Sequence, residues 1–196
     1  MKDRDIRVAL EAYLRARVPN PSLLIHELRV HNGRAIADVV AVYSQMHCFE
    51  IKGETDTIGR ILAQAAFYNE SFPRVTLVTT PNHLAWSLRN APDFWGIATA
   101  NKRHDQIVTI AIRRRAKRNP EFSKPSALLM LWRDELMELA RCLGMNTVRA
   151  GDSRQELAEK IGKFAGRDAI SGYLARTVAR RYLRLNRAHD IGDVRR

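Results

Sequence analysis

Two short apolar runs in the first third of the chain decide its fold. They are Ile36-Ala37-Asp38-Val39-Val40-Ala41-Val42 and His47-Cys48-Phe49-Glu50-Ile51-Lys52-Gly53. Each has the length and the apolar, β-branched or aromatic content of a buried strand. Each also holds an acid, which is costly in such a strand unless it is paired or binds a cation. Because residues two apart on a strand share a face, Glu50 and Lys52 project to the same side.

The surrounding sequence predicts a mixed α/β architecture. Its apolar periodicity, caps and breakers indicate helices over 3–17, 57–71 and 81–89, and strands over 23–30, 34–42, 47–52, 74–80, 95–98 and 106–112. Asn32-Gly33 is a favourable hairpin turn between the first two strands. A meander of strands followed by alternating helices and strands is typical of a mixed sheet flanked by helices.

The hairpin between the two deciding runs carries a geometric requirement. In a regular antiparallel pair, facing residues have a constant index sum. Asp38 shares a face with Glu50 and Lys52 only if that sum is even, and a two- or four-residue loop would place Asp38 on the opposite face. We therefore expect a three- or five-residue loop, or a bulge, in this hairpin.

The composition changes at Arg113-Arg114-Arg115-Ala116-Lys117-Arg118-Asn119-Pro120, where we expect a basic linker. It would separate a domain over 1–115 from an all-helical basic domain over 120–196, with helices over 126–143, 153–164 and 167–185. Residues 1–112 carry 13 Lys/Arg against 11 Asp/Glu, and residues 113–196 carry 20 against 10. Such an uneven charge favours a nucleic-acid partner, although an Arg-rich surface can also serve solubility.

Composition argues against several other classes of protein. Cys48 and Cys142 form no Cys-x-x-Cys pair, so a zinc ribbon or a disulfide framework is unsupported. The apolar stretches are far shorter than a membrane span, and the Met-Lys-Asp-Arg start lacks an apolar signal core. We expect a soluble, cytoplasmic protein with no membrane partner.

A polar stripe is expected on the helix over 57–71. Arg60, Gln64 and Tyr68 are spaced by four and share one face. Alone, such a stripe is solvent-exposed, but beside an acidic strand pair it could line a cleft and contact phosphate.

Together, these elements resemble the PD-(D/E)XK nuclease superfamily, particularly its RecB-like members. The pattern there is a strand Asp, then Glu-x-Lys, then Gln-x-x-x-Tyr on the next helix. This sequence matches it with Asp38, Glu50-Ile51-Lys52 and Gln64-Ala65-Ala66-Phe67-Tyr68. The segment 27–97 is also similar to a largely uncharacterised bacterial and phage family placed in that superfamily. The resemblance implies a restriction-endonuclease-like sheet and a Mg²⁺-dependent deoxyribonuclease in repair or phage defence.

The resemblance also implies a role for each matched residue. Asp38 and Glu50 would bind Mg²⁺ or Mn²⁺, with the Ile51 carbonyl as a further ligand. Lys52 would orient the attacking water and offset charge on the transition state. Gln64 and Tyr68 would position the DNA strand and the water. An additional acid near the metal would be Glu27 or, as the rival, Glu11 on the first helix.

The C-terminal helices suggest a nucleic-acid contact of their own. The segment 131–161 looks like the helix-extension-helix of SAP or Rho N-terminal modules. Arg176, Arg180, Arg184 and Arg187 recur at four, four and three residues and form one helical stripe, suited to phosphate-backbone binding or to plain solvation.

The sequence is therefore compatible with three functions: a metal-dependent nuclease, a catalytically silent nucleic-acid-binding module, or an adaptor whose acids simply pair with arginines. Because one active site cuts one strand, double-strand cleavage would suggest a homodimer.

Overall fold

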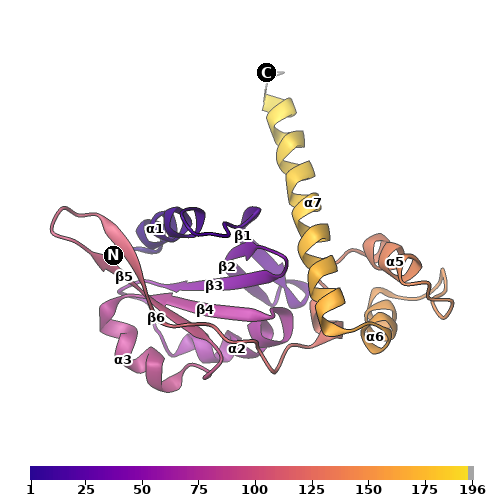
Figure 1. Cartoon of the computed structure of the whole chain (residues 1–196), viewed down its shortest axis with the longest axis horizontal. Coiled ribbons are helices and arrows are strands. Elements are labelled where there is room, and N and C mark those ends of the chain that lie inside the picture. Colours follow the sequence, from indigo (N-terminus) through magenta and orange to yellow (C-terminus); the bar gives the residue numbers. More distant parts are fainter. Residues whose placement is uncertain (194–196) are drawn as a thin grey trace.

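The computed structural model describes the backbone of residues 1–193 and the side chains of residues 1–185. Within these residues the chain forms one six-stranded sheet in the order β1-β2-β3-β4-β5-β6 (Figure 1). The strands are β1 (Leu23–Val30), β2 (Ala35–Val42), β3 (Met46–Lys52), β4 (Arg74–Thr79), β5 (Gly96–Lys102) and β6 (Val108–Arg114). The first three strands form an antiparallel meander, β3, β4 and β5 run parallel, and β6 returns antiparallel. The expected mixed α/β sheet is confirmed.

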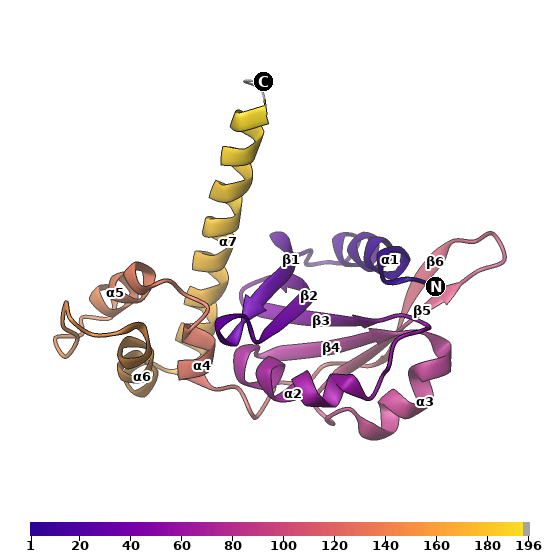
Figure 2. The ribbon, with the colours of Figure 1, turned by 180° about the vertical axis from the view of Figure 1, so that it is seen from behind.

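Helices cover both faces of this sheet (Figures 1 and 2). Helix α1 (Asp3–Arg15) lies on one face and buries Ile6, Leu10 and Leu14 in a small apolar cluster with Phe49 and Ile51. Helices α2 (Arg60–Ser71) and α3 (Pro81–Asn90) lie on the other face, over a larger cluster. Helix α2 begins three residues later than the sequence indicated, because 57–59 form turns. None of the described helices is long and apolar enough to cross a membrane.

The register of the β2–β3 hairpin confirms the expected geometry. Val42 pairs with Met46, so the connection has three residues, and every pair up to Val39 and Phe49 has the even index sum of 88. The ladder ends at that last pair. Asp38 and Glu50 come next on their strands, at the point where β2 and β3 part.

A local irregularity in the first hairpin lies opposite Asp38. Glu27 has a left-handed backbone conformation, with φ 53°, where the β1–β2 register would set it against Asp38. Along β2, Ala37 packs in the α2-side cluster, whereas Val39 packs in the α1-side cluster. The strict alternation of buried positions therefore changes at Asp38, where the strand twists. The two strands are joined by the short helix η1 (His31–Gly33).

The C-terminal part is helical, as expected, but one expected helix is broken. The apolar period predicted a continuous helix over 126–143, whereas the structure has α4 (Lys124–Leu128) and α5 (Arg133–Cys142). Trp132 is extended, and its N–H donates to Glu135 Oε2 at 2.8 Å, which caps a new helix. Helices α6 (Arg154–Phe164) and α7 (Arg167–Asp193) follow, and α7 rises from the end of the sheet (Figures 1 and 2).

The helical part shares a core with the sheet. Leu128, Ile170 and Leu174 belong to the same buried cluster as Val42 and Met46. The connection between the two parts is docked as well, since the fully buried Asn119 donates to the carbonyls of Asn69 and Phe72 at 2.6 and 2.7 Å. The division into domains over 1–115 and 120–196 stays a prediction.

Candidate functional site

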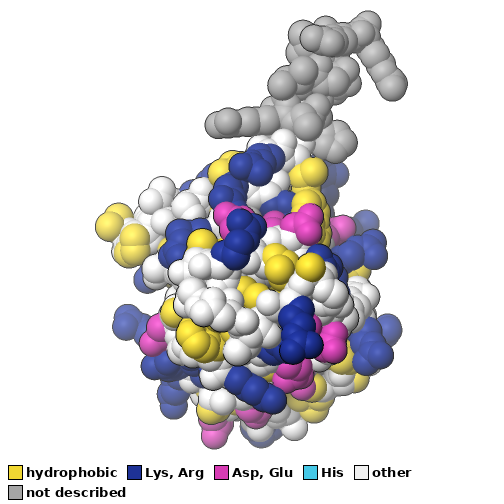
Figure 3. Space-filling view, turned by 90° about the vertical axis from the view of Figure 1, so that its right-hand side faces the viewer, with side chains coloured by type: hydrophobic (Ala, Val, Ile, Leu, Met, Phe, Trp, Pro, Cys, Tyr) yellow, Lys and Arg dark blue, Asp and Glu magenta, His cyan; other side chains and the backbone are white. Residues whose placement is uncertain are grey.

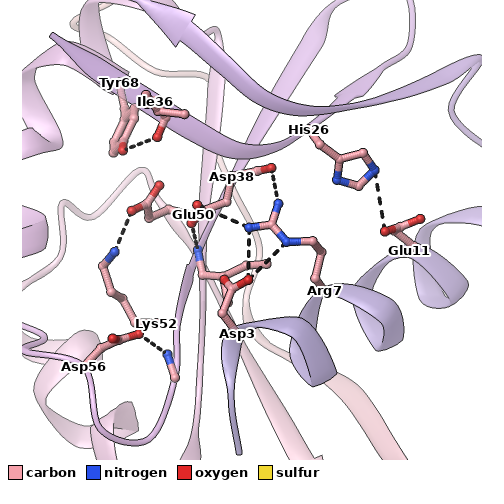
Figure 4. A network of polar contacts seen from close by, with 12 residues as sticks. Asp3, Arg7, Glu11, His26, Ile36, Asp38, Glu50, Lys52, Asp56 and Tyr68 are labelled. Carbon is pink, nitrogen blue, oxygen red and sulfur yellow. Dashed lines mark hydrogen bonds and ion pairs between the residues drawn. The ribbon is translucent and has the colours of Figure 1, made fainter. Parts of the chain in front are cut away.

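Asp38, Glu50 and Lys52 come together at the carboxyl end of β3 (Figure 4). Glu50 lies on the α2 face and is 2% exposed, while Asp38 and Lys52 are half-buried. Lys52 Nζ donates to Glu50 Oε1 at 2.7 Å. The Ile51 N–H, which the β2 ladder no longer uses, donates to Asp38 Oδ2 at 2.7 Å. The end of the ladder thus turns the Asp38 carboxylate towards β3.

Burial raises the proton affinity of both carboxylates. Burial raises the pKa of Glu50 to about 7, the charge of Asp38 adds to this, and Lys52 opposes it. Burial also raises the pKa of Asp38, against the hydrogen bond from Ile51. Burial alone would lower the pKa of Lys52, but its attraction to Glu50 prevails and keeps it a cation. The single positive charge of Lys52 therefore does not fully balance the two carboxylates of Asp38 and Glu50.

Two buried oxygens of this region lack a partner within the described part of the chain. One is Glu50 Oε2 and the other is the hydroxyl of Thr79. Thr79 is the β4 residue paired in register with Lys52, and it is fully buried. A buried polar atom without a hydrogen bond costs free energy and is unusual in a folded protein. Oε2 of Glu50 is thus an acceptor open to a positive ligand. The nearby Tyr68 hydroxyl lowers the pKa of Glu50, but it donates its one proton to the Ile36 carbonyl. The sequence motif did not indicate Thr79 as a residue of this region.

Helix α1 supplies a cation that the sequence did not indicate. Arg7 donates to the backbone carbonyl of Asp38 at 2.6 Å, and its Nη2 lies 3.6 Å from Asp38 Oδ1. Asp3, four residues earlier on the helix, holds the guanidinium with two hydrogen bonds of 3.1 Å (Figure 4). The Asp3–Arg7 spacing was visible in the sequence as a helical ion pair, but its contact with Asp38 depends on how α1 docks.

The three residues of the polar stripe on α2 become progressively more buried along the helix. Arg60 is exposed, Gln64 is half-buried and Tyr68 is fully buried. The Tyr68 hydroxyl donates to the carbonyl of Ile36 at 3.0 Å, and burial together with the charge of Glu50 raises its pKa. Tyr68 thus lies behind the acids, where it cannot touch a DNA strand, and Gln64 and Arg60 point outward from it.

Neither candidate for an additional acid joins the pair. Glu27 is exposed at its irregular backbone position. Glu11 lies on α1, where its Oε1 is 3.6 Å from His26 Nε2. Among the described residues, no three His, Cys, Asp or Glu side chains gather as a metal site. The contribution of the Ile51 carbonyl stays a prediction.

The residues present nevertheless fit a hard divalent cation. Mg²⁺ prefers oxygen ligands, commonly takes one or two carboxylates and keeps several waters. Asp38 and Glu50 supply such oxygens, and Oε2 of Glu50 is buried without a hydrogen-bond partner in the described part of the chain. A cation here would also favour ionised Glu50 over its protonated form.

The expected arginine stripe is on the surface of α7. Arg176, Arg180 and Arg184 are exposed and line a cavity of about 410 Å³ with Tyr43 and Leu183. Arg180 also bonds Glu138 at 3.3 Å. The side chain of Arg187 lies outside the described residues. On the face that looks outward from the C-terminal helices, Lys and Arg side chains are interspersed with Asp and Glu (Figure 3).

Comparisons with known proteins give one family and two distant likenesses. The family described as bacteriophage P4 protein cII matches residues 2–191. The protein cII of Enterobacteria phage P4 is 27% identical over 82 residues, which cover 41% of this chain and 31% of that protein. The match thus spans about a third of the relative's length. A solved structure of a protein of unknown function from Silicibacter pomeroyi has a TM-score of 0.48 at 14% identity, over 78% of this chain and 98% of that one.

Proposed function

The chain belongs to the bacteriophage P4 protein cII family, and we propose that it is a metal-dependent nuclease that hydrolyses DNA phosphodiester bonds. The observation that carries the proposal is a buried Glu50 oxygen without a hydrogen-bond partner among the described residues, next to a second acid, Asp38, and the Lys52 ammonium. The match of these residues to the PD-(D/E)XK pattern supports the same function.

Each residue has a role that follows from its surroundings. Asp38 and Glu50 would hold Mg²⁺ or Mn²⁺. When bound, such an ion supplies Lewis-acid polarisation of a phosphate and a more acidic water. Lys52 remains protonated beside Glu50 and would hold the attacking water and offset charge on the phosphate. Arg7 fixes Asp38 through its backbone carbonyl.

Helix α2 would serve both support and contact. Tyr68 keeps the Ile36 carbonyl satisfied behind the acids and so positions them. Gln64 and Arg60, further out on the helix, would contact the DNA backbone. Arg176, Arg180, Arg184 and Arg187 on α7 would add sequence-independent phosphate contacts.

We also propose the setting in which such an enzyme would work. DNA would be the partner, with cleavage in the cytoplasm during phage replication, repair or defence. Cutting of both strands would suggest a homodimer, since each chain brings one set of acids.

A second candidate is a silent nucleic-acid-binding module that keeps the fold for its basic C-terminal helices. The position of Arg7 favours it, because the guanidinium supplies Asp38 with positive charge without any metal. The two candidates differ in whether Glu50 has a chemical task.

The deciding experiment is the cleavage of end-labelled single- and double-stranded DNA with Mg²⁺, Mn²⁺ or EDTA. Glu50→Gln and Lys52→Met should lower metal-dependent cleavage at least about a hundredfold, the size expected when a group acting on the transition state is lost. Asp105→Asn is the matched control, since Asp105 is an exposed acid in the β5–β6 connection. Binding of DNA by the wild type without cleavage under any metal would favour the silent module.

A further inference from the structure

A second concave site lies on the opposite face of the sheet and at the opposite end of β3. It is a cavity of about 870 Å³ between the end of α1, the β2–β3 connection, the start of β4 and the end of β6. We call it the basic groove. The residues that matter for its chemistry are Arg17, Arg74, Arg114, Arg115, Tyr13 and Tyr43. His47 and Phe49 form its floor on the α1 face of β3.

The charge of the basic groove is unbalanced. Four arginines line it, and no Asp or Glu is among its described lining residues. Arg114 has a structural task, because it donates to the carbonyls of Trp95 and Pro92 at 2.8 Å. Arg17, Arg74 and Arg115 form no ion pair within the described part of the chain.

Two of these arginines are held by neutral groups. Arg17 donates to the Tyr13 hydroxyl at 2.8 Å and lies 5.4 Å from the centre of its ring. Arg74 donates to the Ala116 carbonyl at 2.9 Å. Both guanidiniums are thus oriented but keep their full charge. Several unneutralised guanidiniums around one concavity attract phosphate groups and match their geometry.

Aromatic rings lie between the arginines. Tyr13 and Tyr43 are half-buried and therefore present one side to the groove. His47 stacks on Phe49 with ring centres 4.2 Å apart, and its Nε2 is 2.8 Å from Thr76 Oγ1. Burial, with the charge of Arg74, lowers the pKa of His47 to about 3, so its ring is neutral at physiological pH. Flat neutral rings beside phosphate-binding cations suit unpaired bases, which stack on any aromatic face.

The basic groove continues towards α7. Tyr43 also borders the 410 Å³ cavity lined by Arg176, Arg180 and Arg184. The loop that carries Tyr43 is tied to α7, because Gln45 Nε2 donates to Asp168 Oδ1 at 3.2 Å. Two arginine-lined cavities that meet at one tyrosine form a path longer than a single nucleotide.

We propose that the basic groove binds single-stranded DNA. Its phosphates bind Arg17, Arg74 and Arg115, bases stack on Tyr13 and Tyr43, and the strand continues past Tyr43 to the arginines of α7. Half-buried rings reach bases that are free of a partner strand, whereas a duplex hides its base faces. This inference rests on the groove alone and requires neither the metal nor the nuclease activity of the other end.

The test is fluorescence anisotropy with a labelled 20-residue oligo(dT), in EDTA, at several salt concentrations. The Arg17→Gln/Arg74→Gln protein should bind about tenfold more weakly, with a salt slope reduced by about 1.4, which is two phosphate contacts on a single strand. Tyr43→Leu should bind at least about fivefold more weakly with an unchanged slope, and Tyr43→Phe should bind as the wild type does. Arg103→Gln, an exposed arginine of the β5–β6 connection, is the control for loss of one charge.

The same titrations can overturn the proposal. Unchanged binding in the double arginine variant would move the site elsewhere. A second contrary result is equal affinity for oligo(dT) and a duplex of the same length, together with unchanged binding by Tyr43→Leu. The groove would then bind polyanions in general, without base stacking. Repeating the titration with Glu50→Gln separates this proposal from the nuclease proposal. Oligo(dT) should bind to Glu50→Gln as it does to the wild type. This result is expected whether or not the wild type cleaves DNA. Thermal melts of each variant establish that it is folded.

Discussion

The two ends of β3 carry opposite charge imbalances. At the Glu50 end, three acids, Asp3, Asp38 and Glu50, face the two cations Lys52 and Arg7, and a buried carboxylate oxygen lacks a partner within the described residues. At the His47 end, three arginines face no acid among the described residues of the basic groove. One strand therefore separates a site suited to a cation from a site suited to an anion, on opposite faces of the sheet.

The two imbalances differ in what they cost the fold. Glu50 is buried, and this burial, with the charge of the half-buried Asp38 adding to it, raises its pKa to about 7. The arginines are largely exposed, so water and salt screen them at little cost. A buried carboxylate oxygen that lacks a hydrogen bond in the described structure is thus stronger support for a ligand than an exposed arginine without an ion pair. Substitutions at the two ends should therefore have effects of different size.

The largest difference is expected in the kinetics of DNA cleavage. Glu50→Gln should lower the rate at saturating single-stranded DNA at least about a hundredfold, which is about 2.7 kcal/mol of transition-state stabilisation. Arg17→Gln/Arg74→Gln should instead raise the DNA concentration needed for half the maximal rate by about tenfold, because it weakens binding. Initial rates against DNA concentration measure both. If the double arginine variant loses the saturated rate as Glu50→Gln does, the two ends are not separate sites.

The next effect is on stability in the absence of metal. The folded-state pKa of Glu50, about 7, lies above its ordinary 4.5, so folding takes up a proton between these values. The free energy of unfolding should therefore fall as pH rises from about 4.5 through 7, and Glu50→Gln should remove this fall. Relative to the wild type, the variant should gain about 1–3 kcal/mol between pH 5 and pH 8. Urea unfolding in EDTA at both pH values tests this prediction. If the difference in free energy of unfolding between Glu50→Gln and the wild type is the same at both pH values, the folded protein does not raise the pKa of Glu50.

The smallest effect compares one substitution at the two ends. Tyr68→Phe removes the buried hydrogen bond to Ile36 and should lower the free energy of unfolding by about 1 kcal/mol or somewhat more. Tyr13→Phe removes an exposed bond with Arg17 and should change it by less than about 0.5 kcal/mol. Denaturant titrations of the two variants compare the ends directly. A larger loss at Tyr13 would reverse the assignment of buried and exposed ends.

Much of the sheet could be predicted from the sequence, and so could one of its subtler features. Strand alternation gave β1 to β4 within a residue or two, because apolar strands between breakers are a local signal. The demand that Asp38 lie with Glu50 predicted an even register, and the three-residue connection after Val42 has it. The expected helix over 126–143 was wrong because apolar periodicity continues across its break, where the Glu135 cap starts a new helix.

Contacts made by docking could not be predicted. Arg7 meets Asp38 through the placement of α1, and Thr79 meets Lys52 through parallel pairing across a helix. The sequence suggested Glu27 as an additional acid near the metal. Its backbone is instead left-handed at an irregularity of β1, and its side chain is exposed. The basic groove was hidden for the same reason, since Arg17, Arg74 and Arg115 lie far apart along the chain.

Calorimetric titration with Mn²⁺ shows whether the Glu50 end of β3 binds a divalent cation. We expect one Mn²⁺ per wild-type chain at pH 8, no binding to Glu50→Gln, and unchanged binding to Asp105→Asn. Absence of binding to the wild type, or equal binding to Glu50→Gln, would contradict this assignment and leave these acids with the contacts to Lys52, Arg7 and the Ile51 N–H that the structure shows.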